Sequence, residues 1–252
     1  MDLLLAGKRA IVTGGSRGIG RQVARQLAIE GAEVAIAARD EARLEAAANE
    51  IGSDSGRRVV AVTVDTRISA SVNDMVARVV AELGGVDILV NCAARPGGQA
   101  PAPGYADVTA EGLLDEMNTK VMGYLRCVQA VVPLMTTGGW GRIVNVSGLA
   151  ARRTGTIIGS VRNVAVTALT VNLAAELAPH GIGVNVVHPG ATRTEATTPE
   201  REKAQTGSNL LGRMVGADEV ACVIAFLCSP RSVAVNGDTI TAGGGAPGVI
   251  HY

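Results

Sequence analysis

The chain has 252 residues, of which 47% are hydrophobic and 2% are aromatic, and its 23 basic side chains balance 23 acidic ones. The high apolar fraction excludes a disordered chain, and the zero net charge without a basic tract argues against a nucleic-acid binder. One Phe, one Trp and three Tyr are too few for base stacking to be a main mode of binding. The length suits a single α/β domain over residues 1–252, with an aliphatic core.

Short β-branched apolar runs alternate with longer helical patterns along the whole chain. Strands are predicted at 9–13, 33–38, 59–64, 86–90, 142–146, 183–187 and 238–241. Helices are predicted at 18–30, 41–51, 71–82, 113–135, 157–177 and 217–227. Repeated strand–helix units predict a Rossmann-like, doubly wound parallel sheet of about seven strands, whose near-continuous apolar strands suit burial on both faces.

Two segments interrupt this alternation. A Pro- and Gly-rich loop is expected at 95–104, before the longest helix. The polar stretch 191–208 is too long for a tight turn between a strand and a helix, so we expect it to be a mobile substrate lid.

Membrane and metal sites are not expected. No run reaches the roughly 18 apolar residues of a membrane span, and the N-terminus does not look like a signal peptide. The three histidines are not spaced as metal ligands. The cysteines show no C-x-x-C or zinc spacing, so we expect buried, reduced thiols in a cytoplasmic protein. They are Cys92, Cys127, Cys222 and Cys228.

The first strand runs directly into T-G-G-S-R-G-I-G at residues 13–20, which opens the first helix. Glycines let the backbone turn sharply, and the helix N-terminus then offers free N–H groups to a pyrophosphate. Because the glycines lie between a strand and a helix in the first unit, the pattern predicts a dinucleotide site. The predicted cofactor contacts in this loop are Gly14, Ser16, Arg17, Gly18, Ile19 and Gly20.

The end of the second strand indicates which dinucleotide is preferred. Arg39 lies 19 residues beyond Gly20, where an arginine suits the 2′-phosphate of NADP and an acid suits the 2′-hydroxyl of NAD. Arg17 in the glycine loop can bind the same phosphate. Asp40 could instead turn inward to a hydroxyl, so NADP is favoured and NAD stays open as the alternative.

Together these features resemble the short-chain dehydrogenase/reductase family over essentially the full length. Asp65 matches the family's adenine-contacting acid, and the segment from Asn91 to Ala94, which includes Ala93, resembles its N-N-A-G motif. Ser147 ends the fifth strand at the position of the family's catalytic serine. The family's P-G-x-x-x-T segment, which holds the nicotinamide carboxamide, is matched by Pro189, Gly190, Thr192 and Thr194.

The resemblance implies sheet order 3-2-1-4-5-6-7 and hydride transfer between NADP(H) and a carbonyl or alcohol. It also implies a homotetramer or dimer built partly on the two long helices. The family's active site combines an asparagine, the serine, a tyrosine and a lysine, the last two spaced Y-x-x-x-K.

No Y-x-x-x-K occurs in this chain. The end of the helix at 157–177 matches the corresponding helix end of the family. Counting back from it assigns the tyrosine position to Gly159, with Ser160 as an alternative, and the lysine position to Asn163. Counting back from Gly123 in the preceding helix places the asparagine position at Lys120; Asn118 would be out of phase. Lysine and amide would thus have exchanged helices.

The predicted catalytic set is Lys120, Ser147 and Asn163, without the phenol. A general acid contributes roughly 10²–10⁴-fold to a rate, so a substitute donor is needed. Lys120 can serve if burial lowers its pKa, although a solvated lysine is the alternative. The other candidates are water on Ser147, His188, Tyr105 and Tyr124; we expect His188 to point into the sheet end and Tyr124 to pack on its helix.

A group of arginines lies near the expected substrate pocket. Guanidinium groups bind carboxylate or phosphate bidentately, which is compatible with an acidic or CoA-linked substrate, although solvated loop arginines are commoner. The four are Arg152, Arg153, Arg162 and Arg193.

Three functions stay open on this basis. The favoured one is an NADP(H)-dependent oxidoreductase acting on a small molecule with an atypical active site. The first alternative is an inactive cofactor-binding subunit or regulatory partner, in a hetero-oligomer with an active member of the family. The second is a non-redox lyase or isomerase that uses Lys120 as a base or imine former.

Overall fold

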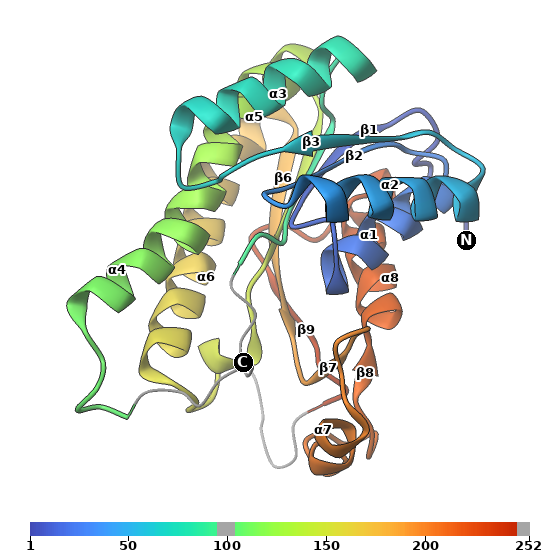
Figure 1. The fold of residues 1–252 in the computed structure, drawn as a ribbon. Helices are drawn as coiled ribbons and strands as arrows, with labels where there is room; N and C mark the ends of the chain where they lie inside the picture. The colour runs from blue at the N-terminus through green and yellow to red at the C-terminus, as the bar shows by residue number, and fades with distance from the viewer. Residues whose placement is uncertain (95–103, 246–252) are drawn as a thin grey trace.

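The computed structural model describes residues 1–94 and 104–245 (Figure 1). Within these ranges seven parallel strands form one sheet in the order β3-β2-β1-β4-β5-β6-β9. They are β1 (Arg9–Thr13), β2 (Glu33–Ala38), β3 (Val59–Thr63), β4 (Ile88–Asn91), β5 (Gly141–Val146), β6 (Ile182–Pro189) and β9 (Thr239–Ala242). The order implied by the resemblance is confirmed, with β9 as the seventh strand.

Helices cover both faces of this sheet. The main ones are α1 (Gly18–Ile29), α2 (Glu41–Ser55), α3 (Ser69–Leu83), α5 (Gly123–Gly138), α6 (Ile157–Leu177) and α8 (Ala217–Leu227). Apolar side chains of α1, α2 and α8 pack in one core, and those of α3, α5 and α6 in another. Figure 1 shows these two groups on opposite sides of the sheet. Both cores are aliphatic, as the composition requires.

The helix predicted at 113–135 is interrupted. It consists of α4 (Ala110–Met117), a π-helical segment over Asn118–Met122, and α5. Local π-helical turns are uncommon and are frequent at functional sites, and this one contains Lys120.

The segment 191–208 has regular structure of its own. A short strand β7 (Thr192–Arg193) pairs with β8 (Val215–Gly216), and α7 (Pro199–Ala204) follows β7. Figure 1 shows α7 beyond β7 and β8, away from the two helical layers. The predicted loop at 95–104 lies outside the described residues except for Gly104.

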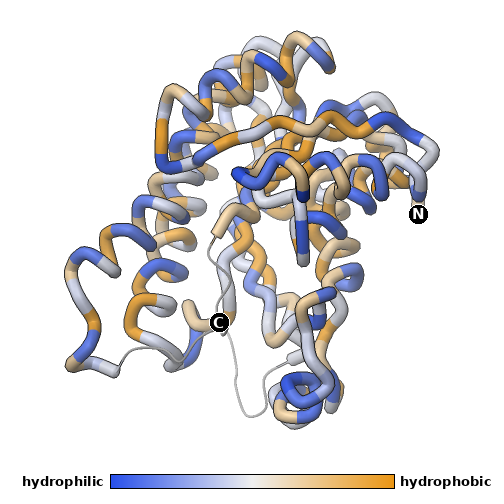
Figure 2. Tube along the Cα trace, viewed as in Figure 1, coloured by the Kyte–Doolittle hydropathy of each residue, from blue (hydrophilic) through white to orange (hydrophobic). Residues whose placement is uncertain are grey.

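Helix α6 is the longest helix of the described residues and is largely apolar. With the turn that follows it, it extends over Ile157–His180 and is long and apolar enough to cross a membrane by length and composition alone. It nevertheless packs on β6, and its tube in Figure 2 lies in a helical layer of the fold. Its outer side exposes Ile157, Val161, Val164 and Val171.

The cysteines are free thiols. Cys127 and Cys228 are buried, and Cys92 is half-buried at the end of β4. The expectation of burial is wrong for Cys222, which is exposed on α8 because it lies opposite that helix's packed face.

Candidate active site

One cavity of about 770 Å³ lies at the carboxyl ends of the central strands. In open α/β sheets this is where ligands bind, at the point where the strand order reverses. Its walls come from the glycine loop, the end of β2, the segments after β3, β4 and β5, the π-helical segment, α6 and the 191–208 segment. The sequence had placed its candidate residues on these same elements.

The glycine loop is shaped by close backbone contacts. Gly14 has φ of +70°, and a Cβ there would lie 2.8 Å from the carbonyl carbon of Cys92. A Cβ at Gly20 would collide with the carbonyl oxygen of Gly14. Only glycine fits these positions, so the loop can bring its backbone and the N-terminus of α1 close to a phosphate. Ser16, Arg17, Gly18 and Ile19 also line the cavity.

Arg17 and Arg39 are exposed side chains that line the cavity beside the glycine loop and the end of β2. Neither forms an ion pair with another described residue. Asp40 also lines this region, but its Oδ1 accepts a hydrogen bond from the Arg43 N–H at 3.1 Å and caps α2. Arg43 itself adds a third guanidinium, which the sequence analysis missed although it lies one turn beyond Arg39.

Asp65 lines the cavity after β3 and is bound by Arg67, whose Nη2 lies 2.6 Å from Oδ2. This hydrogen-bonded guanidinium lowers the pKa of the Asp65 carboxyl, and the charge of Arg39 acts in the same direction. The sequence analysis also missed Arg67 as the partner of Asp65, although its position two residues further along the chain could have indicated the pair.

Asn91 differs from the other predicted cofactor residues. Its Nδ2 donates to Oδ1 of Asn145 at 3.0 Å, and its Oδ1 lies 3.4 Å from Oγ1 of Thr13. The buried side chain therefore ties β1, β4 and β5 together beneath the cavity, whereas Ala93 lines the cavity itself.

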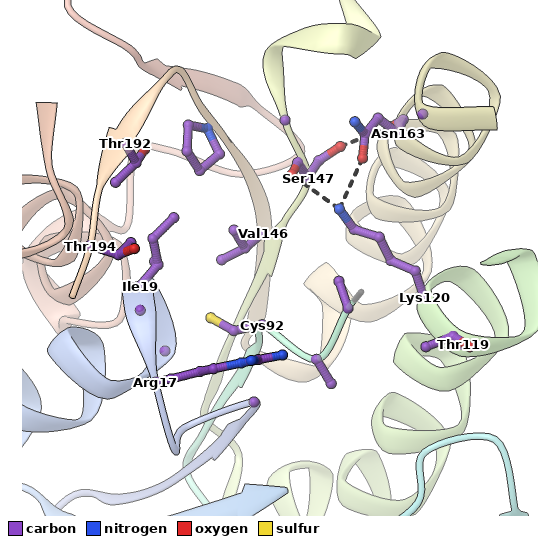
Figure 3. A pocket seen from close by; sticks show the side chains of 18 of the residues that line it. Arg17, Ile19, Cys92, Thr119, Lys120, Val146, Ser147, Asn163, Thr192 and Thr194 are labelled. Atoms are coloured by element: carbon purple, nitrogen blue, oxygen red, sulfur yellow. Dashed lines mark hydrogen bonds between the residues drawn. The ribbon is translucent and has the colours of Figure 1, made fainter. Parts of the chain in front are cut away.

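Lys120 lines the cavity with a side chain that is only 3% exposed. Its Nζ donates to Oδ1 of Asn163 at 2.9 Å and to the backbone oxygen of Ser147 at 3.0 Å (Figure 3). The lysine is therefore not a solvated surface side chain. No other described residue accepts a hydrogen bond from this nitrogen. The third N–H of the ammonium group is therefore available to the cavity.

Burial lowers the pKa of Lys120 to about 7. The positive charge of Arg162 contributes in the same direction, while Cys92 and Glu116 oppose it. Arg162 is bound to Glu116 through Nη1 and Oε2. The amine therefore changes its protonation state near neutral pH, which is the property that a proton donor requires.

Ser147 and Gly159 complete this part of the cavity. The hydroxyl of Ser147 donates to the backbone oxygen of Asn163 at 3.0 Å. Gly159 donates its N–H to Oγ1 of Thr156 at 3.0 Å, which caps α6. A Cβ at position 159 would lie 2.5 Å from that oxygen, so this position is fitted to glycine.

The other candidate donors lie elsewhere. His188 is buried; its Nδ1 accepts from the Gly148 N–H at 3.3 Å, and burial lowers its pKa to about 4. The Tyr124 hydroxyl donates to the Val146 backbone oxygen in the interior. Tyr105 is 87% exposed and does not line the cavity. No phenol of the described residues lines the cavity.

The segment after β6 lines another part of the cavity. Pro189, Gly190, Thr192 and Thr194 line it as predicted positions. Glu195 was not anticipated: its carboxylate accepts from the Gly18 N–H at 2.9 Å. The Glu195 carboxylate thus occupies a backbone N–H at the start of α1.

The predicted arginine group is divided. Arg153 and Arg162 line the cavity, whereas Arg152 donates to the backbone oxygen of Thr239 and Arg193 lies 3.9 Å from Glu202. Arg201 of α7 lines the cavity instead.

Comparison with known proteins agrees with this geometry. A family model described as enoyl-(acyl carrier protein) reductase matches residues 14–247. The short-chain reductase protein NovJ of Streptomyces niveus is 33% identical, over 94% of this chain and 93% of its own. The 3-oxoacyl-[acyl-carrier-protein] reductase FabG of Aquifex aeolicus is 31% identical, over 97% of this chain and 99% of its own.

Solved structures show the same fold. L-sorbose reductase of Gluconobacter frateurii, complexed with NADPH and L-sorbose, superposes with a TM-score of 0.89 at 27% identity, covering 99% of this chain and 100% of its own. A short-chain dehydrogenase of Burkholderia cenocepacia in complex with NADP has a TM-score of 0.85 at 35% identity, covering 96% and 98%. The chain belongs to the short-chain dehydrogenase/reductase family of oxidoreductases.

Proposed function

We propose that this chain is an NADP(H)-dependent oxidoreductase that interconverts a small carbonyl compound and its alcohol, with Lys120 as the proton donor. The observation that carries the proposal is the buried Lys120 amine, held by Asn163 and Ser147 in the cavity that also contains the glycine loop. Family membership alone fixes neither substrate nor activity.

The cavity suits a nicotinamide dinucleotide with a 2′-phosphate. The close-packed turn at Gly14 and Gly20 brings the start of α1 to the cavity, where a phosphate would replace the Glu195 carboxylate on the Gly18 N–H. Arg17 and Arg39 are available to a second phosphate. Two solved relatives are described with NADPH or NADP, which supports the same preference here. Bound NADPH would supply the hydride for the carbonyl carbon.

Proton transfer is assigned to the chain's own amine. In the reductive direction the Lys120 ammonium donates the proton in its third, outward position to the substrate oxygen. Its remaining two N–H groups stay hydrogen-bonded to Asn163 Oδ1 and the Ser147 oxygen, so the neutral amine is held in place afterwards. A pKa of about 7 suits both protonation states at neutral pH.

The two polar side chains beside Lys120 have distinct roles. Asn163 positions the amine through its Oδ1 and can offer its Nδ2 to ribose hydroxyls without adding a charge. Ser147 lines the cavity, and its hydroxyl can orient the substrate oxygen once its O–H turns away from the Asn163 backbone oxygen. In this arrangement Lys120 and Asn163 occupy the family's asparagine and lysine positions, exchanged, and Gly159 occupies the tyrosine position.

The substrate side of the cavity favours an anionic molecule. Arg153 and Arg201 approach it from different segments, and neither has an ion-pair partner among the described residues. We extend the proposal to a substrate with a carboxylate or phosphate, which includes CoA thioesters. The 191–208 segment then acts as its lid within a single domain, since Thr194, Glu195 and Arg201 all line the cavity.

The test is titration of the full chain with NADPH and NADH by calorimetry, followed by NADPH oxidation over a panel of carbonyl compounds with and without an anionic group. We expect tighter binding of NADPH and turnover of at least one anionic carbonyl compound. Tight NADPH binding without turnover on any compound would favour the inactive-subunit alternative, which is motivated by the absence of a phenol among the described residues that line the cavity. No binding of either nucleotide would contradict the proposal.

A further inference from the structure

Lys120 is chemically unlike the other lysines of this chain. The sequence contains three lysines. Lys8 lies over the Trp140 ring at 4.1 Å, and Lys203 is exposed on α7. Only Lys120 is buried, and only Lys120 lines the cavity. The protein therefore places its one interior amine where a small molecule can reach it.

The hydrogen bonds of Lys120 orient its lone pair. A neutral amine has two N–H groups and one lone pair. Both N–H groups have acceptors, Oδ1 of Asn163 at 2.9 Å and the Ser147 oxygen at 3.0 Å. Because these acceptors take both protons, the lone pair of the neutral amine is left for the cavity. A desolvated amine with a directed lone pair, next to another cationic group such as Arg162, is the arrangement that nucleophilic lysines use.

Burial and the charge of Arg162 favour this neutral form, although Cys92 and Glu116 act in the opposite direction. Arg162 on α6 faces it with a positive charge that disfavours the ammonium, and Glu116 on α4 is bound to that arginine. Cys92 is half-buried after β4, and its thiol has a pKa raised to about 12, so it carries no charge at neutral pH. His188 on β6 is uncharged as well, since its pKa lies at about 4.

We infer that Lys120 is also a covalent site for small aldehydes and ketones, which it captures as an imine. The amine nitrogen forms a bond to the carbonyl carbon, and the π electrons move to the oxygen, which takes up a proton. The carbon–oxygen bond then breaks, and water leaves with the oxygen and both amine hydrogens as the C=N bond forms. This step consumes no electrons and requires no nucleotide, so it goes beyond hydride transfer and can occur without it.

The test is reductive trapping on the full chain without nucleotide. Benzaldehyde or acetone is added at pH 7.5 with sodium borohydride, and the modified residue is located by peptide mass spectrometry. An ordinary lysine with a pKa near 10.4 is only about 0.1% neutral at this pH, whereas Lys120 is mostly neutral. We expect Lys120 to be modified at least tenfold faster than Lys8 and Lys203.

Lys203, which is exposed, and Lys8, which is half-buried, are internal controls, and peptide mapping separates the N-terminal amine from all three. Comparable labelling of Lys120 and Lys203, or no labelling of Lys120 in the folded chain, would overturn the inference. A Lys120→Arg variant, which keeps a cation but has no nucleophilic amine, should lose the trapped peptide while circular dichroism reports its fold. NADPH affinity, measured separately, tests the proposed function independently of this result.

Discussion

Nζ of Lys120 lies 2.9 Å from Oδ1 of Asn163, across the gap between the π-helical segment and α6. This hydrogen bond joins the two residues that the sequence had placed at exchanged positions on different helices. Because the amine also reaches the Ser147 oxygen, three elements of the cavity converge on one nitrogen. The arrangement keeps an amine, an amide and a hydroxyl together, although no phenol of the described residues lines the cavity.

We expect Arg39 to set a preference for NADPH over NADH. Replacing it in an Arg39→Ala variant should weaken NADPH binding by about 10–100-fold, since a hydrogen bond to a charged group contributes about 1.5–3 kcal/mol. NADH binding should change little, because NADH lacks the 2′-phosphate. Calorimetry on both nucleotides measures the difference. Arg58→Ala, whose guanidinium pairs with Glu82 away from the cavity, is the control. Equal losses for NADPH and NADH would argue against a 2′-phosphate contact.

The buried amine predicts a pH dependence of stability. The pKa of Lys120 is about 7 in the folded chain and ordinary in the unfolded chain, so protons bind the unfolded state more tightly. The free energy of unfolding therefore rises with pH between about 7 and the ordinary lysine pKa, and it falls again as the pH drops toward 7. Between pH 8 and 9.5 the wild type should gain about 1.4 kcal/mol per pH unit relative to Lys120→Met.

Urea unfolding of both proteins at several pH values provides this comparison. The buried thiols titrate with the opposite sign in this range, but they are present in both proteins and cancel in the difference. Parallel stability curves for the two proteins would show that the Lys120 pKa is not lowered in the folded chain.

Position 159 should tolerate no side chain without a loss of stability. A Cβ there lies 2.5 Å from Oγ1 of Thr156, so Gly159→Ala must displace the hydroxyl that caps α6. Loss of such a cap costs about 1 kcal/mol. Gly138→Ala is the matched control, because a Cβ at that helical position meets nothing within 4 Å. Thermal unfolding should show a loss for the first variant and none for the second; equal behaviour would remove the steric argument.

The outer face of α6 predicts self-association. Ile157, Val161, Val164 and Val171 are all more than 40% exposed at helical spacing, and an apolar stripe of this kind favours an interface. We expect a dimer or tetramer by light scattering, and dissociation in a Val161→Glu, Val164→Glu double variant. Ile29→Glu, an equally exposed apolar residue at the end of α1, should leave the assembly intact. A monomeric wild type would refute this prediction.

Sequence patterns predicted the fold well because its signals are local. Each buried strand is an apolar run, and the T-G-G-S-R-G-I-G turn carries its own backbone constraints, such as the positive φ of Gly14. Counting from matched helix ends placed Lys120 and Asn163, and the structure brings them into contact. Helix bounds were less accurate, since α2 continues beyond the predicted residue 51 to Ser55.

The features that sequence patterns missed depend on tertiary packing. The π-helical segment around Lys120 has no distinctive composition, so a continuous helix was expected there. The Asn91 side chain bonds to Asn145 on the neighbouring strand, and this contact depends on strand pairing. The contact between Glu195 and the Gly18 N–H joins residues far apart in the chain, which no local pattern reports.

The central claim is that the Lys120 amine supplies the proton during NADPH-dependent reduction. The most direct test is the pH dependence of kcat for NADPH oxidation by the wild type and by Lys120→Met, on whichever carbonyl compound the panel identifies. The wild-type rate should fall as the pH rises through about 7, because the donor is then deprotonated. Lys120→Met should bind NADPH normally but turn over about 10²–10⁴-fold more slowly, without that pH dependence. A Lys120→Met variant with the rate and pH profile of the wild type would contradict the account.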